Sequence, residues 1–454
     1  MSIFQELLAC PRCDAKPLIF TEKAYTCKSC KNTYPLLEGI PFLFAEPAFS
    51  LGEWRERLNH QLVQFKSDAD AINRELKQTK LLAPTRQRLQ RVSESYTDQV
   101  FRLQELLSSL DVEGMQANFE TYMALKTRLP QSQGLTTYYA NMHRDWCWGE
   151  KENELSAQQV IKAIGSGAAG RTLVLGAGAC RLAYDVHQQG KTDLTVALDI
   201  NPLLLLSAKK IMNGTPVELY EFPIAPKTVD DQAILRHLTA PEVVNADFYF
   251  VLGDALHPPF PPTSFDTIIT PWLLDIIPED LRAFAPRINR LLKQGGKWIN
   301  FGSLSFMHES LARCYGLDEI ALISREAGFE SFQAEETEMP YMQCPESRHG
   351  RIEQVITFQA TKHKKAPRPK RYQSLPEWIV KGDTPVPQLQ SFQMQAMATR
   401  IHAFIMALVD GRRSVKDMAL MLEQQRLMPR EEAEPAIQAF LTKMYEENLR
   451  NPNF

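Results

Sequence analysis

The segment Arg171-Thr-Leu-Val-Leu-Gly-Ala-Gly-Ala-Cys-Arg-Leu-Ala-Tyr184 decides the fold of this chain. Leu173 to Leu175 form a short aliphatic run that is typical of a buried strand. The turn Gly176-Ala-Gly178 follows, and the residues after it carry apolar side chains at helical spacing. Glycines at such a corner let the backbone turn sharply into a helix and approach a ligand closely. The segment therefore predicts a strand, a ligand-binding turn and a helix.

A carboxylate further along the chain makes this corner a candidate nucleoside site. Thr195 to Asp199 is a second apolar run, and its terminal acid lies about 20 residues beyond the glycines, where it can bond both hydroxyls of a ribose. The third position after Gly178 is Arg181, whereas dinucleotide-binding loops have a small residue there. The pattern therefore favours S-adenosylmethionine (SAM) over a dinucleotide.

Three later stretches complete the pattern of a SAM methyltransferase. Asp254 follows a short apolar run, which suits recognition of the adenine amino group. Phe265-Asp266 opens a strand, and a helix and the turn Gly295-Gly296 into another strand come after it. Strand-like and helix-like runs alternate through this region, so the fold class is α/β, with a Rossmann-like class I methyltransferase sheet whose ligands lie beyond the carboxyl ends of its strands. Residues 213–245 are rich in proline and charge and are interpreted as a surface excursion.

Length and composition limit the remaining possibilities. The 454 residues predict two to four domains. A net charge of -3 gives no general reason to expect a nucleic-acid or membrane partner. The sequence has no leading apolar segment and no apolar run near the ~18 residues of a membrane span. We therefore expect a soluble, cytoplasmic protein.

Four of the eight cysteines form two CxxC pairs near the start of the chain. Two such turns, separated by a hairpin-sized segment, supply the four thiolates of a tetrahedral zinc site. Four cysteines leave no open coordination position, so we expect a structural zinc ribbon over residues 1–46 that the metal helps to fold. The predicted ligands are Cys10, Cys13, Cys27 and Cys30.

The stretch from Tyr34 to Phe44 resembles the tail of the small zinc-ribbon activators that partner tRNA and protein methyltransferases. In that family the ribbon clamps onto a catalytic subunit, and here the resemblance implies a ribbon fused to one. It also keeps open an alternative function, methylation of RNA or of a translation-related protein.

Residues 47–134 are predicted to be helical. Trp54, Leu58, Leu62 and Phe65 lie at helical spacing, and Pro84 marks a corner between two helices. Charged residues fill the other face, which favours a solvated hairpin. A role in capping the substrate or in dimerisation stays open.

A polar and aromatic segment, Asn141 to Glu150, precedes the α/β domain. Arg144 is placed to contact the methionine carboxylate of SAM through a bidentate pair. The alternative is a helix end that Trp146 and Trp148 pack beneath the sheet.

Residues 135–362 resemble the carnosine N-methyltransferases. Several motifs carry the resemblance, and the most specific is Gly295-Gly-Lys-Trp-Ile-Asn-Phe-Gly302. The others are Arg144-Asp-Trp, the glycine loop with Arg181-Leu-Ala-Tyr184, Asp275, Leu317-Asp-Glu-Ile, Ala327-Gly-Phe-Glu, Pro340-Tyr341 and Phe358-Gln-Ala-Thr-Lys362. The resemblance implies a SAM site made of Asn141, Arg144, Gly176, Gly178, Asp199, Asp254, Ala255 and Pro271.

The family's acceptor is an imidazole-bearing dipeptide, and its contacts map to Asp275, His308 and Tyr341. A neutral imidazole nitrogen is nucleophilic near pH 7. Asp275 would then fix the tautomer, and His308 and Tyr341 would orient the ring or take the released proton. The structural alternatives are a helix N-cap for Asp275, a helix-start polar residue for His308 and a packed edge aromatic for Tyr341.

Three positions depart from the family pattern. The family has Gln at the position of Asn141, and a tyrosine-rich cluster where this chain has Arg351-Ile-Glu353. Asn201-Pro202 after the ribose acid instead matches other SAM enzymes. Cofactor binding is therefore better supported than the identity of the acceptor.

Residues 363–380 form a basic, proline-containing linker, and residues 381–454 a small helical domain. The stretch Ala407 to Ala419 resembles the winged-helix domains that bind peptide precursors (PqqD-like). The helix expected over 418–427 is mostly apolar and neutral, so a peptide- or protein-docking role is favoured over DNA binding. Apart from RNA or translation-factor methylation, a further alternative for the whole chain is a non-catalytic scaffold that binds SAM or a partner.

Overall fold

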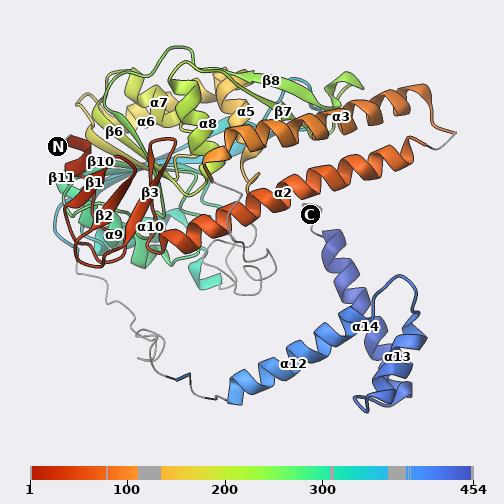
Figure 1. Cartoon of the computed structure of the whole chain (residues 1–454). Coiled ribbons are helices and arrows are strands. Elements are labelled where there is room, and N and C mark those ends of the chain that lie inside the picture. Colours follow the sequence, from red (N-terminus) through yellow and green to blue (C-terminus); the bar gives the residue numbers. More distant parts are fainter. Residues whose placement is uncertain are drawn as a thin grey trace. The chain divides into compact units, whose positions relative to one another are not determined.

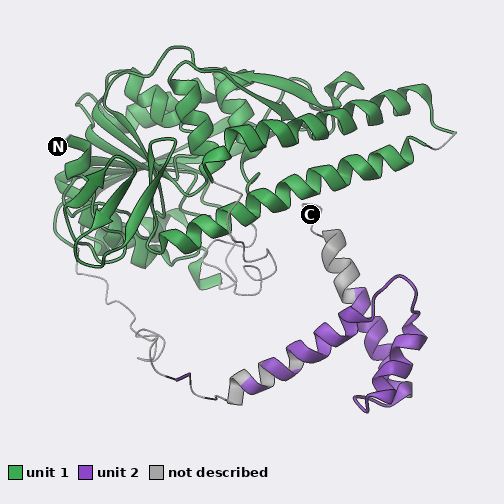
Figure 2. Ribbon diagram, viewed as in Figure 1, with its two compact units in different colours: residues 1–369 green, residues 370–454 purple. Residues whose placement is uncertain are grey.

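The computed structural model describes residues 3–77, 80–110, 134–306, 311–366, 385–386, 388 and 390–450. The chain forms two compact units, residues 1–369 and 370–454 (Figure 2). The segments expected to be a ribbon, a helical hairpin and an α/β domain therefore belong to one unit.

An eleven-stranded sheet forms the centre of the first unit (Figure 1). Its α/β part runs in the order β9-β6-β5-β10-β11-β13-β12. Numbered along residues 170–362 this is 3-2-1-4-5-7-6, with the last two strands antiparallel to their neighbours. The predicted Rossmann-like methyltransferase sheet is confirmed. The strands are β5 (Gly170–Leu175), β6 (Thr192–Asp199), β9 (Phe248–Gly253), β10 (Phe265–Pro271), β11 (Leu292–Gly302), β12 (Phe329–Tyr341) and β13 (Arg351–Lys362).

Helices cover both faces of this sheet. Leu173 packs in one cluster with Phe284 and Ile288, whereas its neighbour Val174 packs in another with Val160. Successive residues of a strand point to opposite faces, so the two clusters lie on opposite sides. The helices are α6 (Glu150–Ile164), α7 (Arg181–Gln188), α8 (Pro202–Met212), α9 (Leu281–Leu291) and α10 (Leu317–Glu326), and short turns are η3 (Asp230–Gln232) and η4 (Leu311–Arg313).

The N-terminal ribbon extends the same sheet. Its last strand pairs in parallel with β9, with Phe42 opposite Leu252 and Leu43 opposite Gly253. The pairing satisfies backbone groups of β9 that would otherwise be exposed at the edge of the α/β part. The ribbon and the α/β part therefore share one sheet. The ribbon consists of α1 (Ile3–Glu6), β1 (Leu18–Thr21), β2 (Ala24–Cys27), β3 (Thr33–Leu37) and β4 (Ile40–Leu43).

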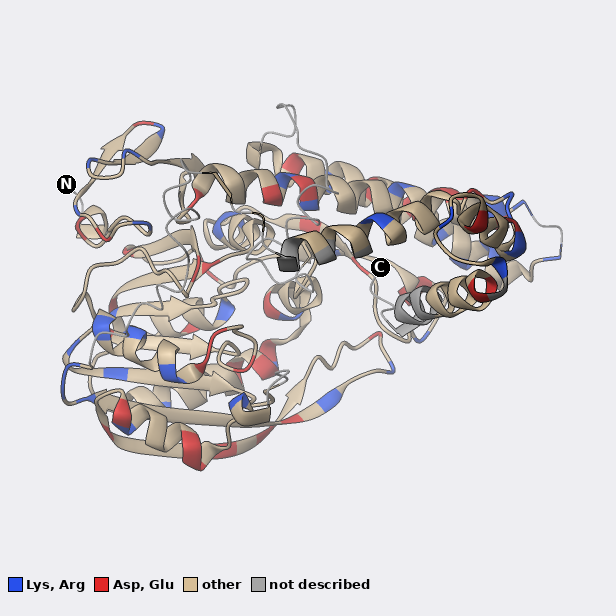
Figure 3. Cartoon of the chain, turned by 90° about the horizontal axis from the view of Figure 1, so that it is seen from below, with Lys and Arg blue, Asp and Glu red and all other residues tan. Residues whose placement is uncertain are grey.

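Two long helices, α2 (Pro47–Glu75) and α3 (Ala83–Leu106), lie side by side and are followed by the turn η1 (Ser108–Leu110) (Figure 1). The predicted corner before Pro84 is confirmed. The predicted apolar stripe of α2 is buried, with Trp54 1% and Leu58 0% exposed, in a cluster that includes Leu204 and Leu252. Charges of both signs are interspersed along the hairpin (Figure 3). The hairpin is solvated on one side only, because its other side packs on the α/β core.

Residues 213–245 lie mostly at the surface, as expected, but the segment also contains two strands and a few buried residues. β7 (Val217–Glu221) and β8 (Ile234–Leu238) form a two-stranded sheet in which Leu219 is 1% and Leu238 0% exposed. The many charged residues of this region hid the alternation of apolar and polar side chains that is typical of strands. They form partly buried contacts, including Arg236 with Glu221 at 2.7 Å.

The segment before the α/β domain is helical. It comprises α5 (Tyr139–His143) and the π-turn η2 (Arg144–Trp148), and it leads directly into α6. Trp146 is 2% exposed, and its indole Nε1 donates to the carbonyl of Ala179 at 2.8 Å. The aromatic packing that was considered as an alternative is therefore present, and it anchors this turn beside the glycine loop.

In the second unit the described residues 390–450 form α12 (Gln390–Ala407), α13 (Val415–Gln424) and α14 (Arg430–Arg450) around a small apolar cluster with Met418, Leu422 and Ile437. Ser414 caps α13, since its hydroxyl accepts from the backbone N–H of Asp417 at 3.2 Å. The winged-helix resemblance stays a prediction. Over the described parts of the chain, no helix is both apolar enough and long enough to span a bilayer.

Candidate cofactor and acceptor site

A cavity of about 590 Å³ lies at the carboxyl ends of the parallel strands. Its wall contains every residue that the sequence assigned to SAM: Asn141, Arg144, Gly176, Gly178, Asp199, Asp254, Ala255 and Pro271. These residues come from η2, α5 and the ends of β5, β6, β9 and β10. The position matches the ligand crevice of doubly wound sheets, where loops at the carboxyl edge converge.

The glycine loop has the backbone form that its sequence predicts. Gly176 and Gly178 have φ values of +70° and +56°, in the left-handed region that favours glycine. A Cβ at Gly176 would lie 2.9 Å from Cδ1 of Leu273. The corner therefore requires glycine, and the chain passes close to the cavity without a side chain in the way.

Asp199 is held in place by backbone donors. Its Oδ2 accepts from the N–H of Gly178 at 2.8 Å, and its Oδ1 from the N–H of Asn201 at 2.9 Å. The side chain is largely buried, and this burial raises its pKa to about 6, although the backbone N–H groups act in the opposite direction. A carboxylate fixed at the cavity wall, with further lone pairs, can accept two ribose hydroxyls.

Asp254 directly follows β9, the next strand toward the ribbon. Its Oδ1 accepts from the N–H of Leu256 at 2.8 Å, and its Oδ2 lies 3.2 Å from Nδ1 of His257. The loop it belongs to brings Ala255 into the same wall. This arrangement suits an acceptor for the exocyclic amine of adenine at the far end of the cavity.

Arg144 is a partly buried cation on the wall. Its Nε and Nη2 both donate to Oδ1 of Asp145, at 2.9 and 2.6 Å. Its guanidinium also lies 5.6 Å from the ring centre of Tyr341. A guanidinium has five N–H donors, so the pair with Asp145 orients Arg144 while leaving donors for a ligand carboxylate.

Aromatic side chains gather at the other end of the cavity. The amide of Asn141 donates to the hydroxyl of Tyr341 at 3.0 Å. The ring of Tyr341 lies 4.8 Å from that of Trp272, and Arg351 stands 4.6 Å above it. Tyr341 is thus held from three elements and is more than a packed edge residue.

The two other predicted acceptor contacts have different outcomes. Asp275 does not line the cavity. Its Oδ2 accepts from the hydroxyl of Ser303 at 2.7 Å and from the N–H of Ser305 at 3.1 Å. It is not the N-cap of the next helix, because Asp280 has that role. His308 lies outside the described residues.

Sequence reasoning missed several residues of this wall. Tyr138 lines it in a left-handed conformation with φ of 63°. The side chain is 43% exposed, and partial desolvation together with the charges of Tyr341, Asp275 and Asp199 raises the pKa of its hydroxyl. Asp275 stands in the chain between Leu273 and Ile276, which both line the wall, so it is close to the cavity although it does not line it. Phe49 and Glu53 of α2 also line the wall; they lie outside the apolar stripe that the sequence identified, and the capping role left open for this helix named no residues.

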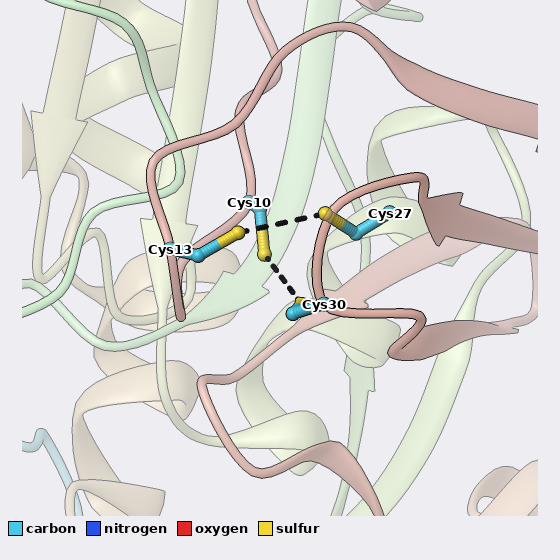
Figure 4. Close-up of side chains that lie close together, drawn as sticks. All are labelled: Cys10, Cys13, Cys27 and Cys30. Atoms are coloured by element: carbon cyan, nitrogen blue, oxygen red, sulfur yellow. Dashed lines mark hydrogen bonds between the residues drawn. The ribbon is translucent and has the colours of Figure 1, made fainter.

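The four predicted zinc ligands converge on one point (Figure 4). All four Sγ atoms lie within 4.8 Å of one another. Cys10 and Cys30 are 3.5 Å apart and Cys13 and Cys27 3.6 Å. A tetrahedral zinc with Zn–S bonds of about 2.3 Å separates its sulfur atoms by about 3.8 Å. The geometry therefore fits a four-thiolate zinc site.

A family model described as carnosine N-methyltransferase matches residues 127–364. The match covers more than half of the 454 residues and includes most of the cavity wall. The chain belongs to this family. The predicted class, a SAM-dependent methyltransferase, is confirmed at the level of the family.

Individual relatives are distant. A carnosine N-methyltransferase of Dictyostelium discoideum is 29% identical over 149 residues, which are 29% of this chain and 31% of that protein. The match thus spans about a third of that relative's length.

Among solved structures, the Haemonchus contortus phosphoethanolamine N-methyltransferase 2 with S-adenosyl-L-methionine is 14% identical over 55% of this chain and 60% of that one, with a TM-score of 0.34. A complex of the Haloferax volcanii Trm112 methyltransferase activator with a methyltransferase is 13% identical over 50% of this chain and 96% of that one, with a TM-score of 0.34.

Proposed function

We propose that this chain transfers the methyl group of SAM to a ring nitrogen of an imidazole in a histidine-containing small molecule or peptide. The observation that carries the proposal is the convergence of the glycine loop, Asp199 and Arg144 on one cavity whose other end is lined by Tyr341. Membership of the carnosine N-methyltransferase family supports the reaction class.

The residues present fit the cofactor. Gly176 lacks the Cβ that would press on Leu273 of the cavity wall, and Asp199 presents a fixed carboxylate. In this proposal Asp199 holds the ribose, Asp254 the adenine amine and Arg144 the methionine carboxylate. SAM supplies an activated methyl group when bound, so the protein contributes mainly alignment of the acceptor.

The residues at the acceptor end would orient the imidazole and stabilise the positive charge that it gains on methylation. Tyr341, held by Asn141, would hydrogen-bond or stack on the imidazole, and Trp272 would bound the ring on one side. Asp275 would accept the N–H of the nitrogen that is not methylated, which fixes the tautomer and stabilises the cationic product. His308 joins this group on the strength of the family resemblance.

The ribbon is proposed to hold a structural zinc ion through Cys10, Cys13, Cys27 and Cys30. Metal analysis of the purified protein should find one zinc per chain. Cys10→Ser should lower stability, because a structural site contributes folding free energy. Cys147→Ser, at an exposed cysteine outside the cluster, is the control. Absence of zinc, or equal stability of both variants, would contradict the assignment.

The function is tested by calorimetric titration of SAM, followed by transfer of labelled methyl to carnosine, histidyl peptides, tRNA and protein fractions. Binding together with label in an imidazole compound supports the proposal. Label confined to tRNA or protein would move the acceptor to a macromolecule and keep the cofactor. Failure to bind SAM would contradict the methyltransferase function and leave the scaffold alternative.

Two further expectations concern the chain outside the α/β domain. The second unit is proposed to dock a peptide or protein partner, in line with its resemblance to PqqD-like domains. The protein is proposed to act in the cytoplasm, where CxxC thiols stay reduced and available to zinc.

A further inference from the structure

Part of the cavity wall comes from a segment that the family match does not include. The match begins at residue 127. The wall also contains Phe44, Ala45 and Glu46, which follow the last ribbon strand, and Phe49, Ser50, Glu53 and Trp54 of α2. We call residues 44–54 the bridging segment, because it joins the ribbon to the helical hairpin.

Strand pairing places the bridging segment at the adenine end of the cavity. Leu43 of β4 is paired in parallel with Gly253 of β9. Phe44 and Asp254 are the next residues of these neighbouring strands, so both leave the sheet at the same edge. The residue assigned to the adenine amine therefore has the bridging segment as its neighbour.

The segment presents groups that recognise a nucleoside. Phe44 is buried on the wall, and Phe49, in the first turn of α2, is 41% exposed. Glu53 is a buried carboxylate on the same wall, oriented by Arg57 at 3.0 Å. Aromatic rings stack on nucleobases, and each such contact contributes substantially to binding.

The cysteine knuckles hold this segment in position. The amide of Asn32, two residues after Cys30, donates to the carbonyl of Ala45 at 3.2 Å. Arg12, between Cys10 and Cys13, donates to Asn32 at 3.4 Å and to Glu46 at 3.5 Å. A path of direct contacts therefore leads from the thiolate cluster to the cavity wall.

We propose that the zinc ribbon is a structural part of the cofactor site: the bridging segment closes the adenine end of the cavity, with Phe49 against the base, and the metal-bound knuckles keep it there. The inference rests on the proposed SAM-binding function and deepens it. The ribbon then contributes to cofactor affinity directly, in addition to stabilising the edge of the sheet.

The first test removes the aromatic ring. Phe49→Ala should weaken SAM binding about tenfold, as expected for the loss of one base–aromatic stack. Adenosine, measured by displacement of SAM, should lose affinity by the same factor, and methionine should be unaffected, because the contact is with the nucleoside. Phe101→Ala removes a 64% exposed ring of the same hairpin, from α3 and outside the cavity wall, and should leave all three affinities unchanged.

The second test acts on the knuckles. Asn32→Ala, and separately removal of the metal by a chelator, should each weaken SAM and adenosine binding several-fold in calorimetry, with the protein still folded by circular dichroism at the titration temperature. Lys28→Ala, an exposed basic residue of the second knuckle, is the control for Asn32.

The outcomes separate this inference from the function on which it rests. SAM affinity unchanged in both Phe49→Ala and Asn32→Ala, but lost in Asp199→Ala, would overturn the inference and keep the cofactor site. SAM affinity unchanged in Asp199→Ala as well would overturn the proposed function. A loss of affinity for methionine in Phe49→Ala would also overturn the inference, because it would place the ring at the wrong end of the cavity.

Discussion

The two ends of the cavity are built in different ways. At the nucleoside end, the polar groups are bonded to nearby backbone, as when Asp199 accepts from Gly178 and Asn201. At the acceptor end, Asn141, Trp272 and Tyr341 come from α5, the end of β10 and β12, and they position one another through side chains. The acids of the first end are thus held by backbone N–H groups, whereas the side chains of the second end are held by one another across distant elements. Sequence motifs can therefore predict the cofactor, but they cannot predict the acceptor.

The largest expected effect tests the backbone-fixed end. Asp199→Ala should weaken SAM binding at least about 100-fold, because two charge-assisted hydrogen bonds to ribose are lost. Calorimetry measures the affinity. Asp193→Ala, at an exposed position near the start of the same strand, should bind normally. A normal affinity of the Asp199 variant would contradict the assignment of Asp199 to SAM and with it the proposed function.

Tyr341→Phe tests the side-chain-built end. Removing the hydroxyl that accepts from Asn141 should lower kcat/KM for the imidazole acceptor about tenfold, at the upper range for one hydrogen bond. SAM affinity should stay within about twofold, since the hydroxyl is at the acceptor end. Steady-state kinetics and calorimetry together check this split. Tyr249→Phe removes another tyrosine hydroxyl, bonded to Asp247, and should change neither quantity.

The pH dependence of cofactor binding sharpens the assignment of Asp199. Burial raises its pKa to about 6, so the carboxylate becomes protonated as the pH falls through that value. SAM affinity should then drop several-fold between pH 7 and 5.5, because a protonated acid accepts fewer hydrogen bonds.

The contribution of Asp199 to the stability of the ligand-free protein has the opposite sign. The folded state binds the proton more tightly than the unfolded state, so this contribution decreases as the pH rises from about 4 to 6.

Calorimetric titrations of SAM at several pH values measure the effect on binding. Asp199→Asn should bind weakly, with a flat profile over the same range, and a wild-type profile that is equally flat would contradict the assignment.

The smallest expected effect concerns Glu152 of α6, which holds the backbone that follows Tyr341. Its carboxylate accepts from the N–H groups of Met342 and Gln343 at 3.1 and 3.0 Å, directly after Tyr341. Glu152→Gln should raise the KM for the acceptor two- to threefold, since the amide keeps one accepting oxygen and loses its charge. Glu154→Gln, on the same helix, is the control. An unchanged KM would show that the turn after Tyr341 needs no support from α6.

The comparison of the two ends also explains what sequence reasoning achieved elsewhere. The two CxxC pairs were sufficient to predict a cluster, because each pair places its thiols through one tight turn. The strands and buried leucines within residues 213–245 were not predicted, because the burial of Leu219 and Leu238 depends on partners distant in the sequence. Phe49 and Glu53 were missed for the same reason: helical spacing identifies an apolar face but not which residues beside it line a cavity.

By itself the sequence determined the fold class, the glycine loop, the two acids that lie on the cavity wall and the four thiol positions, since each depends on backbone conformation within a few residues or on the regular order of strands. Only the tertiary structure decided that β4 pairs with β9, that the bridging segment joins the cavity wall, and that Asn141 meets Tyr341. These contacts join residues as much as 210 positions apart, as between Phe42 and Leu252. No local pattern encodes such pairs, because they form only when the whole core is packed.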